Sequence, residues 1–169
     1  MTTPAYTTRV RVTRARPPLR TAELLETGET VTFGTPGYQG DFYGLGDGEL
    51  RERGGTFDYL VAAVGACLMG TFGRALTVRG IASDGDRLTA EAEGHVEVEN
   101  GIMVMKRVTV RYRLRLDDRA QLEAAERAHA HHVGACGVAR SVMPSLGIDT
   151  TMEPTVAETS APATGAAHD

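Results

Sequence analysis

The chain has 169 residues, of which 41% are hydrophobic, 24% charged and 5% aromatic, and its formal net charge is −4. This length and composition are typical of one globular domain with a hydrophobic core. The slight acidic excess argues against nucleic acid as the main partner, because phosphate backbones require a basic surface. Two Cys are too few for a disulfide scaffold and cannot alone complete a structural zinc site, but they can form a single redox pair.

The first strands are predicted near the amino end. Residues 7–14 alternate polar and apolar side chains, the period of a strand with one buried face. Two further extended segments, residues 21–25 and 30–33, flank the turn-forming pair Thr27-Gly28. Residues 1–5 are short and polar and lack the apolar stretch of a signal peptide, so a cytoplasmic location is expected.

A glycine-rich segment, residues 34–55, follows these strands and carries the aromatic side chains Tyr38, Phe42 and Tyr43. It shows no periodic pattern. A connection of this length is more typical of a functional flap than of a plain linker, and we interpret it as a flap.

The strongest local pattern is a long apolar helix. Thr56 is a suitable N-cap, and Asp58 lies in the first turn, where a carboxylate meets the positive end of the helix. The longest uncharged, mostly apolar stretch, residues 59–73, is shorter than the ~20 residues needed to cross a bilayer, which indicates a buried helix and no membrane association. Apolar side chains cover most of the helix circumference, which predicts packing on several sides: Leu60, Val61, Val64, Leu68, Met69, Phe72 and Leu76.

Two long alternating strands come next. Residues 87–98 and 106–116 are separated by Asn100-Gly101, a pair typical of tight hairpin turns, so the two strands are predicted to be antiparallel. Asp117-Asp118 is predicted to cap a following helix that runs to about His132, with an interruption at Val133-Gly134.

The remaining elements are short. A second helix is predicted to carry Cys136, and a last strand covers residues 148–152. Residues 154–169 are rich in Ala, Thr, Ser and Pro and have no apolar period, so we expect a disordered tail. The sequence therefore predicts one α+β domain over residues 1–153.

The two Cys allow different interpretations. Cys67 lies in the middle of the apolar helix, where Cys commonly serves as a small buried hydrophobe. Cys136 follows a predicted helix break and precedes Arg140 by one turn, and this cation favours a thiolate.

Three His just before Cys136, at positions 129, 131 and 132, suggest a weak metal-site alternative. No Cys-x-x-Cys pair or carboxylate cluster accompanies His129, His131 and His132, and imidazoles at a helix carboxyl end are favoured by the helix dipole. No metal is therefore predicted.

Two segments resemble the OsmC/Ohr family, which is named for osmotically inducible protein C and the organic hydroperoxide resistance protein. The run GGTFDYLVAAVGAC, residues 54–67, is similar to the family segment that leads to its first redox Cys, and AERAHAHHVGACGVARSV, residues 125–142, is similar to the segment around its second. The resemblance covers about residues 54–152. It implies an α+β fold in which antiparallel sheets wrap around long central helices of an intertwined homodimer.

The resemblance also implies an activity, the thiol-dependent reduction of organic hydroperoxides. Cys67 would then be the peroxidatic thiol and Cys136 the resolving thiol, a dithiol reductant would restore both, and no metal or organic cofactor is needed. In the family an Arg near the amino end, held by a Glu, activates the first Cys. Here Asp58 occupies the Glu position, and Arg20 is the best candidate for the Arg, ahead of Arg16 and Arg14.

A second hypothesis is a binding protein with the same fold, in which the dimer cleft holds a small hydrophobic ligand and the thiols take no part. The enzyme predicts Cys67 and Cys136 within disulfide reach, with Cα atoms ~4.4–6.8 Å apart, and an Arg that points at Cys67. The binding protein predicts distant thiols, or thiols without a cation.

Overall fold

A computed structural model describes residues 3, 5–16, 19–46, 48 and 51–157, and it shows an α+β protein. The chain divides into two compact units, Met1–Leu60 and Val61–Asp169, and each unit is described by itself. Residues 158–169 of the predicted tail lie outside the described residues, and so do Pro17 and Pro18, which follow the first predicted strand.

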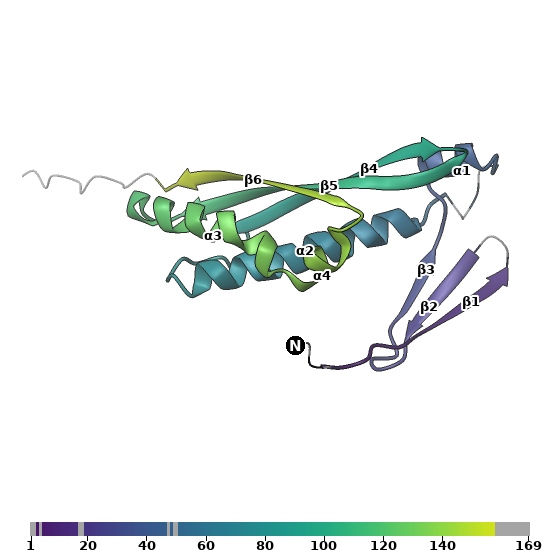
Figure 1. Cartoon of the computed structure of the whole chain (residues 1–169), viewed down its shortest axis with the longest axis horizontal. Helices are drawn as coiled ribbons and strands as arrows, with labels where there is room; N and C mark the ends of the chain where they lie inside the picture. Colours follow the sequence, from purple (N-terminus) through teal and green to yellow (C-terminus); the bar gives the residue numbers. More distant parts are fainter. Residues whose placement is uncertain (1–2, 4, 17–18, 47, 49–50, 158–169) are drawn as a thin grey trace, which may run out of the picture. The chain divides into compact units, whose positions relative to one another are not determined.

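The first unit contains an antiparallel sheet in the order β1-β2-β3 (Figure 1). The strands are β1 (Val10–Arg16), β2 (Leu19–Leu24) and β3 (Thr30–Phe33). All three were predicted, with shifts of a few residues at the ends of β1 and β2. Gly28 adopts a φ of 74° in the turn between β2 and β3, a conformation that glycine takes without strain.

The predicted flap contains regular structure after all. A short helix, α1 (Gly37–Phe42), lies within it, and the Arg51 guanidinium donates to Asp41 Oδ1 at 2.7 Å and to the Gly37 carbonyl at 3.0 Å. These bonds tie the two ends of the glycine-rich segment together.

The long helix is α2 (Thr56–Thr77), and its start differs slightly from the prediction. Thr56 is the first helical residue instead of the cap, and the Asp58 carboxylate accepts a hydrogen bond from the Gly55 N–H at 2.6 Å. This bond is one half of a capping box, in which the third helical residue reaches back to the backbone before the helix.

Within the chain, α2 buries one stripe and not the several sides that were predicted. The stripe repeats every four residues: Val64, Leu68, Phe72 and Leu76. Ala62, Ala63, Ala66 and Gly70 lie exposed on other faces. With 22 residues α2 is long and apolar enough to cross a membrane by length and composition alone, a test that the core helix of a soluble protein also passes.

The second unit contains a mixed sheet in the order β4-β5-β6. Its strands are β4 (Leu88–Glu99), β5 (Ile102–Leu116) and β6 (Gly147–Val156). Asn100 and Gly101 have φ values of 50° and 78°, which confirms the predicted hairpin turn between antiparallel β4 and β5. β6 runs parallel to β5 and includes residues 154–156, which were assigned to the tail.

A bulge divides β5 into two phases. His95 pairs with Arg107 and Val96 with Met105, so Lys106 is the extra residue. Because one inserted residue reverses the alternation, the buried positions change from odd to even numbers: Met103, Met105, Val108, Val110, Tyr112, Leu114 and Leu116.

The connection from β5 to β6 contains η1 (Arg119–Gln121), α3 (Leu122–Ala135) and α4 (Gly137–Val142). The predicted interruption at Val133-Gly134 was wrong, because α3 continues through both residues and ends at Ala135. Together with α2, these helices cover one face of the β4-β5-β6 sheet (Figure 1). The opposite face carries cross-strand ion pairs, including Arg111–Glu93 at 2.9 Å and Arg113–Glu91 at 3.1 Å.

Candidate active site

The two Cys, 69 residues apart in sequence, meet in the second unit. Cys67 lies in the middle of α2, and Cys136 lies between α3 and α4. The Cys136 thiol donates to Cys67 Sγ, and the two sulfur atoms are 3.1 Å apart. Both are free thiols, and a disulfide between them requires an approach of only about 1 Å.

Cys136 is held by the joint between two helices. Its backbone is extended, with φ −81° and ψ 119°, and it serves as the N-cap of α4. Its Sγ accepts a hydrogen bond from the Ala139 N–H at 3.5 Å, and the residue is completely buried. Cys67, in contrast, is half-buried.

The surroundings assign different protonation states to the two sulfurs. The Cys136 thiol and, after it, the backbone N–H of Val138 lower the pKa of Cys67, against a smaller opposing effect of burial. Burial is the main reason that the pKa of Cys136 is raised. Of the two sulfurs, Cys67 is therefore the one that more readily loses its proton, and Cys136 is the donor in the hydrogen bond between them.

Part of this thiolate stabilisation was not predicted from the sequence. The first-turn amides of α4, Val138 and Gly137, both lower the pKa of Cys67. The Thr71 hydroxyl, one turn along α2, donates its proton to the Cys67 carbonyl at 2.9 Å. Gly137, unlike a proline, leaves an N–H available at this position, but the sequence does not show which group that N–H reaches.

The other two predicted site residues, Asp58 and Arg20, belong to the first unit. Asp58 is exposed and bonds to the Gly55 N–H, as described above. Arg20, on β2, is half-buried and donates from Nη2 to the Gly34 carbonyl at 3.3 Å, while its Nε is buried without a hydrogen-bond partner among the described residues. Arg14 on β1 is exposed, and the Arg16 side chain lies outside the described residues.

The second unit also contains a buried polar pair, Tyr112 on β5 and His132 on α3. The His132 Nδ1 is 2.6 Å from the His129 carbonyl, which can only accept, so Nδ1 carries the proton. His132 Nε2 therefore accepts from the Tyr112 hydroxyl, 3.0 Å away. Burial raises the pKa of Tyr112 and lowers the pKa of both His129 and His132, which keeps all three neutral near pH 7.

These contacts leave the His cluster without a metal-binding geometry. Among the described residues no group of three or more His, Cys, Asp or Glu could hold a metal ion. His131 is exposed, whereas His129 and His132 pack against the Phe72 ring at centroid distances of 5.6 and 5.0 Å.

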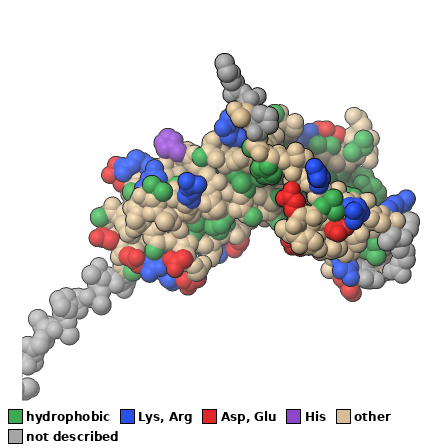
Figure 2. All heavy atoms as spheres, turned by 90° about the horizontal axis from the view of Figure 1, so that it is seen from below, with side chains coloured by type: hydrophobic (Ala, Val, Ile, Leu, Met, Phe, Trp, Pro, Cys, Tyr) green, Lys and Arg blue, Asp and Glu red, His purple; other side chains and the backbone are tan. Residues whose placement is uncertain are grey.

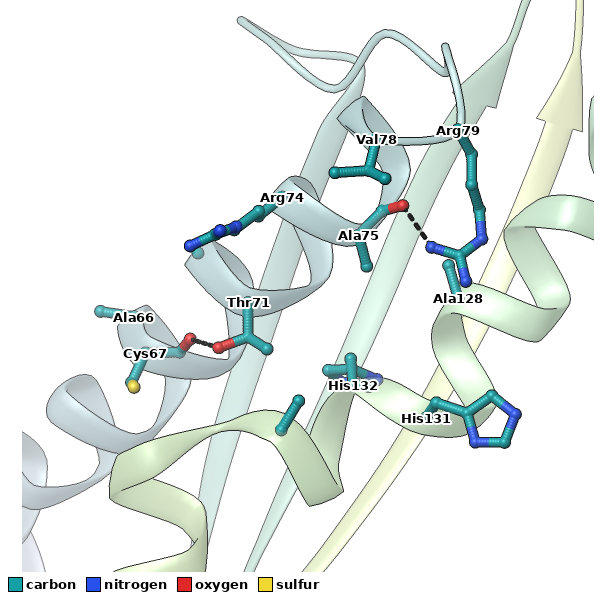
Figure 3. Close-up of a pocket in the computed structure, with 12 residues that line it drawn as sticks. Ala66, Cys67, Thr71, Arg74, Ala75, Val78, Arg79, Ala128, His131 and His132 are labelled. Carbon is teal, nitrogen blue, oxygen red and sulfur yellow. Dashed lines mark hydrogen bonds between the residues drawn. The ribbon is translucent and has the colours of Figure 1, made fainter.

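A cavity of about 670 Å³ opens beside Cys67, between α2 and α3 (Figure 3). Its walls are mostly small and apolar: Ala66, Gly70, Ala75, Val78, Ala128 and Ala135. The polar groups come from Thr71, Arg74, Arg79, His131 and His132, and no carboxylate of the described residues lines the cavity. Cys67 lines this cavity, and Cys136 does not.

The structure is thus an α+β fold that brings two free thiols within 3.1 Å of each other, one of them beside a cavity. The sequence model of the family described as OsmC-like protein matches residues 55–151, more than half of the chain. The chain belongs to the OsmC-like protein family, which confirms the resemblance inferred from the sequence.

Solved structures show the same fold. An OsmC-like protein of unknown function from Vibrio cholerae is 16% identical, covers 88% of this chain and 100% of its own, and has a TM-score of 0.71. An organic hydroperoxide resistance protein from Elizabethkingia anophelis is 13% identical, with coverage of 91% and 100% and a TM-score of 0.65. One from Legionella pneumophila is 14% identical, with coverage of 89% and 98% and a TM-score of 0.62. No curated protein matches the sequence.

Proposed function

We propose that this protein is a thiol peroxidase that reduces organic hydroperoxides through Cys67 and Cys136. The observation that carries the proposal is the 3.1 Å separation of the two sulfurs. Family membership supports it, because two structural neighbours are named as organic hydroperoxide resistance proteins.

The proposed reaction has three steps. The Cys67 thiolate attacks the outer oxygen of the hydroperoxide; the O–O bond breaks, the alkoxide takes a proton to leave as an alcohol, and Cys67 becomes a sulfenic acid. The Cys136 sulfur then attacks Cys67 Sγ, and the sulfenic hydroxyl leaves with a proton as water. A dithiol reductant finally gives two electrons and two protons to the disulfide and becomes a disulfide itself.

We assign the role of activating cation to Arg20, with Asp58 as its proposed carboxylate partner. The Nε of Arg20 supports this, since among the described residues this buried donor has no hydrogen-bond partner and an anionic acceptor would satisfy it. If the role is correct, Arg20→Lys retains part of the peroxide reactivity and Arg20→Ala loses most of it. Equal rates in the two variants would remove Arg20 from the mechanism.

We further propose that the active form is a homodimer. On β4 the residues that alternate with the glutamates are small or apolar, and Val96 and Val98 remain 38% and 46% exposed. Ala62 and Ala63 of α2, which do not line the cavity beside Cys67, are exposed as well, and hydrophobic side chains reach the surface between charged ones in Figure 2. A second copy would cover such surfaces.

We also propose a cytoplasmic location, where reductants regenerate the thiols.

The decisive experiment treats the reduced protein with a slight excess of cumene hydroperoxide and maps the products under non-reducing conditions by mass spectrometry. The expected product is a Cys67–Cys136 disulfide, with one hydroperoxide consumed per chain. Cys136→Ser should stop at a Cys67 sulfenic acid, which dimedone labels, and Cys67→Ser should consume nothing. Unchanged thiols in the wild type would overturn the proposal.

The alternative, a binding protein for a small hydrophobic ligand, is favoured by one observation, the apolar cavity of about 670 Å³. Of the two expectations of this alternative, distant thiols are contrary to the 3.1 Å separation, whereas thiols without a cation are not contradicted. Tight binding of an apolar fluorescent probe by a protein that leaves hydroperoxides intact would decide for it.

A further inference from the structure

The two sulfurs differ in their access to solvent. Cys136 is 0% exposed and is enclosed at the joint of α3 and α4. Cys67 is half-buried and lines the cavity between α2 and α3. A disulfide joining them would keep one sulfur on the cavity side and the other in the interior.

The charged side chains among the described residues that line the cavity are cationic. Arg74 and Arg79 line it from α2 and the turn that follows, and His131 lines it from α3 (Figure 3). The Arg79 guanidinium donates to the Ala75 carbonyl at 2.7 Å, which holds it near the cavity. Since none of the Asp and Glu that the structure describes lines the cavity, these side chains favour anionic molecules over cationic ones.

We propose that the reductant is an anionic thiol that enters this cavity and attacks Cys67, not Cys136. This inference rests on the proposed function, because it concerns the disulfide which that function forms. The reductant thiolate bonds to Cys67 Sγ, the Cys67–Cys136 bond breaks, and Cys136 leaves as a thiolate that takes a proton from solvent. A second thiol, from the same reductant, then attacks the reductant sulfur of the mixed disulfide and releases the Cys67 thiolate.

One chemical effect opposes this direction. The sulfur with the lower pKa is the better leaving group, and since the pKa of Cys67 is lowered, leaving-group chemistry favours attack on Cys136. Attack on Cys136 also requires an incoming sulfur in line with the S–S bond, and a completely buried atom offers no such approach. Access therefore decides the direction.

The first test maps the mixed disulfide. The wild type is oxidised with diamide, which needs no peroxidase activity, then treated briefly with 3-mercaptopropionate, acid-quenched and alkylated. The mercaptopropionyl adduct is expected on Cys67 and the alkyl group on Cys136. An adduct mainly on Cys136 would overturn the proposal that the reductant attacks Cys67, even if the protein is a peroxidase. An adduct on Cys67 in a protein that reduces no hydroperoxide would support the direction of attack and contradict only the peroxidase function.

The second test needs no disulfide in the protein. The anionic aromatic disulfide 5,5′-dithiobis(2-nitrobenzoate) reacts with single-thiol variants, and Cys67 in Cys136→Ser should react at least about tenfold faster than Cys136 in Cys67→Ser. Equal rates, or a faster Cys136, would refute the difference in access.

The charge preference has its own control. Rates of Cys67 in Cys136→Ser with anionic, neutral and cationic small disulfides should fall in that order, by about threefold per step at low salt. Arg74→Ala should reduce this spread, whereas Arg119→Ala, on η1 and outside the cavity lining, should not. A cationic disulfide that reacts as fast as an anionic one would exclude an anionic reductant.

Discussion

Oxidation of the thiol pair should strengthen the fold by an amount that can be calculated from the chain. Cys67 and Cys136 are 69 residues apart, and for a closed loop of about 70 residues the chain-entropy relation gives a stabilisation of about 4 kcal/mol at 25 °C. The sulfurs already lie 3.1 Å apart in the reduced protein, so closing the bond requires little movement of the folded state. Most of the calculated stabilisation should therefore be observed.

The assay is urea unfolding of reduced and diamide-oxidised protein at one protein concentration. The chain has no Trp, so far-ultraviolet circular dichroism is the suitable signal. With a denaturant dependence of about 2 kcal/mol per M, the midpoint should rise by about 2 M on oxidation. Cys136→Ser, treated in the same way, should show no shift.

Mass spectrometry must first confirm that the oxidised sample has lost two hydrogens within one chain. If that sample then unfolds at the same urea concentration as the reduced protein, or at a lower one, the disulfide strains the native state. The inference that the two thiols are already in position for bonding would then be wrong.

Three further predictions concern the surroundings of the thiols. Cys136→Ala and Gly137→Pro should each raise the pKa of Cys67, because each removes a hydrogen-bond donor to its sulfur. Gly137→Ala keeps the N–H, and its added Cβ meets no atom within 4 Å, so this control should leave the pKa unchanged. The pH profile of iodoacetamide alkylation measures the pKa, and equal profiles for Gly137→Pro and Gly137→Ala would contradict the prediction. Tyr112→Phe should lower the free energy of unfolding by about 1–3 kcal/mol, because His132 Nε2 loses its donor, and an unchanged urea midpoint would disprove the bond. Burial lowers the pKa of His129 and His132, so the unfolded chain binds protons before the folded chain does as the pH falls below their ordinary pKa of 6.5. The free energy of unfolding should therefore decrease below that pH. Urea midpoints that stay constant from pH 8 to 5 would show that these side chains are not buried as neutral groups.

The elements that could be predicted from the sequence are those fixed by local chemistry. Asn100 and Gly101 take up the positive φ values that a tight hairpin requires, and the alternation on both sides of them defines β4 and β5. β3 was predicted at its observed bounds because a turn with Gly28 precedes it and the glycine-rich segment follows.

The elements that were missed depend on tertiary contacts. Gly134 costs a helix only about 1 kcal/mol, and packing of Ala128 and His132 in the core outweighs this, so α3 continues to Ala135. The parallel pairing of β6 with β5 has no local signature, because it joins residues about 40 positions apart in sequence.

The same limit applies to the candidate site. Cys67 and Cys136 could be paired in advance by resemblance to a family, and the structure brings them together. The amides that support the thiolate could not be predicted, because they require knowledge of where α4 begins relative to α2. That relation depends on the joint at Cys136, whose extended backbone has no distinctive sequence signal.

The position of Cys136 in the crossover from β5 to β6 has a consequence for the order of folding. The α2 helix and the β4–β5 hairpin consist of local contacts, which form early, whereas the parallel β5–β6 ladder must wait until residues 147–156 are available. During synthesis Cys67 therefore leaves the ribosome long before its partner is held in place. If a Cys67–Cys136 disulfide is allowed to form in a refolding chain, its rate of formation reports the docking of the last strand.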